Sequence, residues 1–117
     1  VLCKRTRSDG GDARTQAFDF GGNWLTYTKK SLDDDMGDVT WNQRVEHARE
    51  CLVSSLGVAD LRHVSLFIDV GCGSGIHSLA ALRAGAQSVL SFDLQEGSVT
   101  STRLLRESAG KPDTWTV

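Results

Sequence analysis

A short apolar run that ends in three alternating glycines is the feature that most constrains this sequence. Residues 64–70 read VSLFIDV, and glycines follow at positions 71, 73 and 75. An apolar run of this length, closed by glycines, is typical of a strand buried on both faces of a parallel sheet. Glycine also permits a sharp turn into a following helix. We therefore predict a strand, a tight turn and a helix that begins near Gly75.

The same order of elements is repeated downstream. Residues 88–92 (SVLSF) predict a second strand, and residues 96–108 predict a second helix, which Gly110 and Pro112 would stop. Residues 115–117 (WTV) have the composition of a strand that is just beginning. Strands that alternate with helices in this way pair in parallel. The predicted fold class is α/β, a Rossmann-like three-layer parallel sheet that is present in part.

Helical spacing identifies the faces that these helices should bury. In the segment 96–108, a face is predicted from Val99, Thr102 or Arg103, and Arg106. Upstream, Thr40 and Gln43 have the spacing of a capping box that would start a helix over residues 41–56. The apolar positions of that helix recur at intervals of three, four and four, at Val45, Ala48, Leu52 and Leu56.

These elements divide the chain into an arm and one domain. Residues 1–16 carry four basic side chains among Ser, Gly and Asp, so we expect a flexible arm. Residues 17–57 should form a helical cap, with a further helix around residues 24–32, and residues 64–117 should form the βαβαβ portion. The interval 17–117 is thus expected to be one partial cofactor-binding domain.

Composition argues against several classes of partner. The formal charge is −2, from 13 basic and 15 acidic residues, so no global attraction to nucleic acid or an anionic membrane is expected. No apolar stretch approaches the roughly 18 residues that a membrane helix needs. Three cysteines without a C-x-x-C pair support neither a disulfide framework nor zinc, and the run Asp33–Asp35 has the character of a solvated turn. We expect a cytoplasmic protein without a metal site.

The glycine turn and Asp93 together predict a site for a nucleoside-containing cofactor. Glycines let a ligand lie against the backbone, and the N-terminus of the following helix directs N–H groups toward it. Asp93 ends the next predicted strand, where a carboxylate can accept hydrogen bonds from both ribose hydroxyls. A dinucleotide fingerprint would have its third glycine at position 76, which is Ile76. Asp69 would oppose a pyrophosphate and favour an ammonium or sulfonium group.

The segment DVGCGSG at residues 69–75, with SFD at residues 91–93, resembles motifs I and II of the class I S-adenosylmethionine-dependent methyltransferases. Residues 18–117 are similar to the amino-terminal half of a bacterial branch of that family that acts on small molecules. The resemblance implies S-adenosylmethionine as the cofactor. It also implies that Asp93 binds the ribose, that Leu94 packs on the adenine, and that the methionine part is held by Asp69, Gly71, Cys72, Gly73 and Gly75.

The function implied by this resemblance is methyl transfer to an unidentified small-molecule acceptor. No residue can be assigned as the catalytic base. Because the family has further strands, we expect this chain to be an incomplete, inactive fragment that is either self-associated through an exposed sheet edge or marginally stable. Two alternatives stay open, a noncatalytic module that binds an adenosyl cofactor and, with less support, a nicotinamide-dependent oxidoreductase.

Several conspicuous side chains have competing interpretations. Trp24 and Tyr27 could close over a sulfonium, because aromatic faces attract cations, but an anchoring role for their helix is favoured slightly. Cys72 stands between two glycines, where a packing role is expected instead of a nucleophilic one. His77 would lie in the first turn after the glycines and is expected to be a surface residue.

Overall fold

The computed structural model describes residues 19–33 and 37–117, so the expected arm at residues 1–16 lies outside it. In chain order the elements are α1 (Phe20–Asp33), α2 (Gly37–Leu56), β1 (Phe67–Val70), α3 (Ile76–Arg83), β2 (Val89–Phe92), α4 (Glu96–Ser108) and β3 (Trp115–Thr116). The strand–helix alternation predicted from residue 64 onward is confirmed, including the bounds of α4.

The three strands form one parallel sheet in the order β1-β2-β3. Phe67 pairs with Val89, and Val89 pairs with Trp115, so these three residues form one row across the sheet. Parallel neighbours joined through helices are the arrangement expected of a βαβαβ series. The predicted class, a partial Rossmann-like α/β fold, is confirmed.

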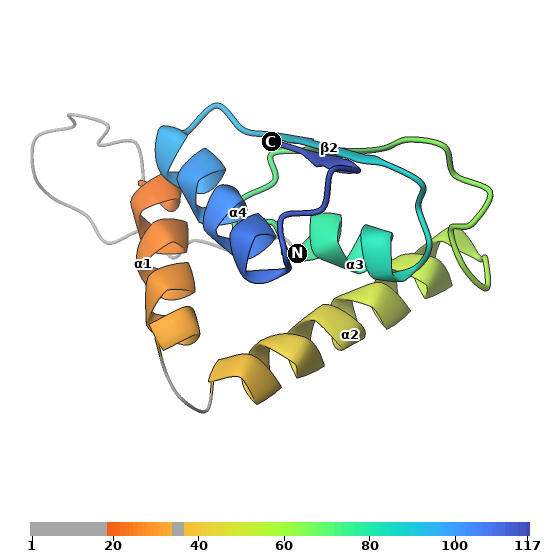
Figure 1. The fold of residues 1–117 in the computed structure, drawn as a ribbon, viewed down its shortest axis with the longest axis horizontal. Helices are drawn as coiled ribbons and strands as arrows, with labels where there is room; N and C mark the ends of the chain where they lie inside the picture. The colour runs from red at the N-terminus through yellow and green to blue at the C-terminus, as the bar shows by residue number, and fades with distance from the viewer. Residues whose placement is uncertain (1–18, 34–36) are drawn as a thin grey trace, which may run out of the picture.

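Within the described residues, all four helices lie on one side of this sheet (Figure 1). Successive residues of a strand point to opposite faces, and Val89, Ser91 and Trp115 point toward the helices and are buried. On the other face, Ile68 is 51% exposed and Val70 is 71% exposed. The prediction of a first strand buried on both faces is therefore wrong for this chain, because its described helices cover only one of them.

The hydrophobic core lies between the covered face and the helices. Trp115 is fully buried there, together with Val45 of α2, Leu79 of α3 and Leu105 of α4. The helices pack in two pairs, α1 on α4 and α2 on α3. The α1–α4 contact is close, since a Cβ added at Gly97 would lie 2.5 Å from the carbonyl carbon of Gly21.

Three details of the helices correct the sequence-based expectations. Helix α1 begins at Phe20 and not near residue 24, and α2 begins at Gly37, which places Thr40 inside the helix and not at its cap. The buried face of α4 carries Ser98, Ser101, Thr102 and Leu105, so Thr102 is confirmed while Val99 and Arg106 of the predicted row are only partly buried. Small polar residues suit this face because they let the backbone of α1 approach. The Thr28 and Ser101 hydroxyl oxygens, for example, are 2.6 Å apart.

Among the helices in the described ranges, none is both long enough and apolar enough to cross a bilayer.

Candidate cofactor-binding site

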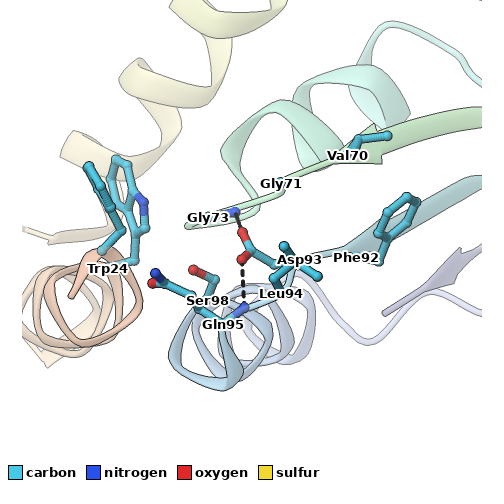
Figure 2. A pocket seen from close by; sticks show the side chains of 10 residues that line it. Trp24, Val70, Gly71, Gly73, Phe92, Asp93, Leu94, Gln95 and Ser98 are labelled. Carbon is cyan, nitrogen blue, oxygen red and sulfur yellow. Dashed lines mark hydrogen bonds between the residues drawn. The ribbon is translucent and has the colours of Figure 1, made fainter. Parts of the chain in front are cut away.

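A pocket of about 410 Å³ lies at the carboxyl ends of β1 and β2. In Figure 2, the glycine turn forms one side of it, the segment after β2 forms another, and Trp24 of α1 stands opposite Asp93. Ligands of open parallel sheets bind at this edge, outside the carboxyl ends of the strands. The lining residues are Phe20, Trp24, Val70, Gly71, Gly73, Phe92, Asp93, Leu94, Gln95 and Ser98.

The glycine turn has the backbone conformation that the sequence predicts. Gly73 has φ 55° and Gly75 has φ 81°, in the left-handed region that disfavours other residues. Both positions also lack space for a side chain. A Cβ at Gly73 would lie 2.9 Å from Trp24 Nε1, and a Cβ at Gly75 would lie 2.8 Å from Thr102 Cγ2. Glycine at position 73 thus lets the Trp24 indole pack against the turn, whereas a Cβ at Gly71 would have no atom within 4 Å.

Asp93 joins the two loops that border the pocket. Its Oδ2 accepts a hydrogen bond from the Gly73 N–H at 3.1 Å, and its Oδ1 accepts one from the Gln95 N–H at 2.9 Å (Figure 2). A carboxylate oxygen has two lone-pair sites, so each oxygen can accept a further hydrogen bond from a ligand hydroxyl. The two backbone donors fix the carboxylate at the rim of the pocket.

Asp69 has a different environment, on the covered face of the sheet. The Trp115 Nε1–H donates to Ser91 Oγ at 2.8 Å, the Ser91 and Ser78 hydroxyl oxygens are 2.7 Å apart, and Ser78 Oγ–H donates to Asp69 Oδ2 at 2.5 Å. Because Ser78 gives its hydrogen to the carboxylate, Ser91 must donate to Ser78. Each group in this series therefore donates to the next, and the last acceptor is the Asp69 carboxylate, just before the glycine turn.

Cys72 is buried between the turn and α4. Burial is the main cause that raises the pKa of its thiol, and negative charge on Asp69 and Asp93 acts in the same direction. The Thr102 hydroxyl is 3.2 Å from both Cys72 Sγ and the Gly73 carbonyl oxygen. A neutral buried thiol is a poor nucleophile, so the geometry agrees with a packing role.

The structure brings some of the predicted cofactor-binding residues to the pocket and keeps others behind it. Gly71, Gly73, Asp93 and Leu94 line the pocket, and the Leu94 side chain is fully exposed. The remaining three, Asp69, Cys72 and Gly75, are not among the lining residues.

Other lining residues were not assigned to the site by the sequence. Gln95 and Ser98 follow Asp93 at the start of α4, a position that the motif itself could have indicated. Phe20 and Trp24 come from α1, far away in the sequence, and only the concentration of aromatic residues there gave a signal.

Helix α1 is held in place by contacts that also orient Trp24. The Gly21 N–H donates to Gln95 Oε1, and the Ser101 hydroxyl donates to the Trp24 carbonyl oxygen at 3.2 Å. The indole of Trp24 meets the Tyr27 ring edge-on, with centroids 5.9 Å apart, and Tyr27 meets Trp41 in the same manner at 5.8 Å. Trp24 is therefore a supported wall of the pocket while it stays 38% exposed.

A parallel sheet whose first strand leads through a glycine turn into a helix, with an acidic residue at the end of the second strand, is the arrangement found in the class I S-adenosylmethionine-dependent methyltransferases. The profile of the ribosomal protein L11 methyltransferase family, a family of this class, matches residues 49–110. That interval is more than half of the chain, and the chain belongs to this family.

Individual relatives match shorter parts. The ribosomal protein L11 methyltransferase of Gloeobacter violaceus is 42% identical over 74 residues, which are 62% of this chain and 22% of the relative. That of Oceanobacillus iheyensis is 54% identical over 39 residues, 33% of this chain and 12% of the relative. That of Syntrophomonas wolfei is 50% identical over 50 residues, 43% of this chain and 16% of the relative. No solved structure matches.

These comparisons correct one expectation from the sequence. The small-molecule acceptor was inferred from a resemblance to a branch that acts on small molecules, and it is contradicted because the relatives are named for a ribosomal protein as their acceptor. The resemblance rests on glycines and carboxylates that are assigned from the sequence to the methyl donor. These residues contain no information about the acceptor.

Proposed function

We propose that this chain is the S-adenosylmethionine-binding part of a protein methyltransferase whose acceptor is ribosomal protein L11 or a protein like it. The observation that carries the proposal is the meeting of Gly73 and Asp93 at one pocket, where bare backbone and a fixed carboxylate lie side by side. Family membership supplies the class of donor and of acceptor. The chain spans about a fifth or less of the length of the relatives described above, so the activity of a whole protein is part of the proposal.

The residues of the pocket suit the parts of such a cofactor. We assign the ribose to Asp93, whose two oxygens are already oriented by backbone N–H groups. Gly71 and Gly73 offer backbone to the methionine part; the space around Gly71 is open, and a side chain at Gly73 would collide with the Trp24 indole. Leu94 is assigned to the adenine ring, since its exposed apolar side chain borders the pocket.

Asp69, Cys72 and Gly75 are assigned to the methionine part through the shape of the turn. Ser78 fixes one carboxylate oxygen of Asp69, and we propose that its negative charge attracts the ammonium group of the methionine part. Buried Cys72 and Gly75 hold the turn against Thr102 of α4. The sulfonium of the cofactor supplies an activated methyl group. The task of these residues is therefore to bind and orient it.

The cofactor assignment is tested by calorimetric titration of the chain with S-adenosylmethionine, S-adenosylhomocysteine and NAD. We expect the first two to bind and NAD not to bind, because Ile76 stands where a dinucleotide site needs its third glycine. Asp93→Ala should weaken binding by about thirtyfold to a thousandfold, through the loss of two charge-assisted hydrogen bonds. Equal affinity for the two variants would contradict the ribose role.

A matched control separates this effect from the loss of a negative charge. Asp113 is an exposed carboxylate outside the pocket, so Asp113→Ala should leave the affinity unchanged. Thermal unfolding of Asp93→Ala should be recorded as well, because Asp93 also links two loops.

The acceptor assignment needs a second assay on the whole protein of which this chain is proposed to be a part, transfer of a radiolabelled methyl group to purified ribosomal protein L11. Incorporation of label supports the proposal. Cofactor binding without any incorporation would favour the alternative of a noncatalytic module that binds an adenosyl cofactor.

A further inference from the structure

The cofactor pocket has an aromatic wall that its proposed ribose and adenine contacts do not use. Trp24 lines the pocket from α1, on the side opposite Asp93 (Figure 2). Its Nε1 is the atom nearest to the space above Gly73, at 2.9 Å from a Cβ built there. Trp24 Cε2 and Cδ1 lie 3.2 and 3.3 Å from the same point, so the built Cβ lies over the plane of the five-membered ring and the indole turns a ring face toward the glycine turn.

Few charged groups line the pocket around Trp24. Among the described residues that line it, Asp93 is the sole charged side chain. Both of its oxygens already accept backbone hydrogen bonds, and the proposed function gives it the ribose. The Asp69 carboxylate, to which the proposed function gives the ammonium group, receives a hydrogen bond from Ser78 on the covered face and is absent from the lining. At the end of the pocket next to Gly73, the indole is thus the group best placed to attract positive charge.

We infer that Trp24 is a specificity-determining residue that recognises the positive charge of the sulfonium and so distinguishes the methyl donor from its neutral thioether product. The inference rests on the proposed function and deepens it. An indole face attracts a cation through its quadrupole, and tryptophan does so best among the aromatic side chains. The wall favours the charged donor over S-adenosylhomocysteine, and this preference assists product release after the methyl group has left.

The surroundings of Trp24 are built to hold the ring in this position. Tyr27 packs against it edge-on at 5.9 Å, and the Ser101 hydroxyl binds its carbonyl oxygen. Gly21 and Gly97 bring the backbones of α1 and α4 into close contact. A supported ring loses little entropy when a ligand arrives, so its attraction is expressed in affinity.

The test is the ratio of dissociation constants for S-adenosylhomocysteine and S-adenosylmethionine, measured by calorimetry on the chain and on Trp24→Leu. Leucine keeps an apolar wall and removes the π face, so the ratio should fall by about twofold to thirtyfold, the range of a cation–π contact. Trp24→Phe should lie between the two. Sinefungin, in which a charged amine replaces the sulfonium, should respond to the variants as S-adenosylmethionine does.

Phe92→Leu is the matched control, because Phe92 is an aromatic residue that lines the same pocket from β2. It should change the affinities for both ligands by the same factor. An unchanged ratio in Trp24→Leu overturns the inference, as does an equal loss of affinity for charged and neutral ligands. Failure of the unsubstituted chain to bind any of the three adenosyl ligands overturns the proposed function itself, and the inference with it.

Discussion

The two faces of the three-stranded sheet differ in what they bury and in what they do. The covered face carries Val89, Ser91 and Trp115, all buried against the helices, and ends in the carboxylate of Asp69. The open face carries Ile68 and Val70, which are 51% and 71% exposed although they are apolar. One face therefore holds the fold together and supports the glycine turn from below, while the other contributes to the site only where its strands end at the pocket.

The largest expected effect compares substitutions at two consecutive residues of β3 whose side chains point to opposite faces of the sheet. Trp115→Ala should lower the free energy of unfolding by about 3–5 kcal/mol, because it removes a fully buried ring and leaves a cavity. Thr116 is the next residue of β3 and faces the open side, so Thr116→Ala should change the stability by no more than about 0.5 kcal/mol. Urea unfolding of both variants measures the difference, and similar values for the two would refute the distinction between the faces.

A smaller effect is expected for the series of hydrogen bonds that links Trp115, Ser91, Ser78 and Asp69 on the covered face. Ser91→Ala removes the acceptor of the Trp115 N–H and the donor to Ser78. Leaving buried polar groups unpaired costs about 1–3 kcal/mol of stability. The stability is again measured by urea unfolding.

Ser88 provides the control for that measurement. It precedes β2 and donates to the Ser65 carbonyl oxygen at 2.6 Å in a more exposed position. Water can replace this partner, so Ser88→Ala should cost less than Ser91→Ala. Equal losses of stability would mean that the hydrogen bonds from Trp115 to Asp69 contribute no more to stability than an ordinary surface hydrogen bond.

Local patterns were sufficient to predict the central part of the fold. The apolar run before Gly71, the glycine turn and the bounds of α4 depend on neighbours in the sequence, and all are found in the structure. Asp93 could be placed at the rim of the pocket for the same reason, since it directly follows a strand.

The features that the sequence did not reveal depend on distant contacts. Trp24 reaches Gly73 because α1 packs closely on α4 through Gly21 and Gly97, residues that are 76 positions apart. Strand alternation places Asp69 on the same face as Ser91, but its hydrogen bond to Ser78 depends on how α3 packs against the sheet. Exposure of Ile68 could not be read from an apolar run, because such a run indicates burial on both faces without showing which elements would cover them.

The smallest expected effect compares similar chemical changes on the two faces. Ile68→Thr replaces an apolar β-branched residue by a polar one of equal strand preference, at a position that is already half exposed. Its cost should stay within about 0.5 kcal/mol of unfolding free energy. Val89→Thr makes a similar change at a residue that is 1% exposed, and it should cost about 1–3 kcal/mol because the hydroxyl is buried among apolar neighbours. If Ile68→Thr proved as costly as Val89→Thr, Ile68 would have to be covered in solution, and the contrast between the two faces would belong to the isolated chain alone.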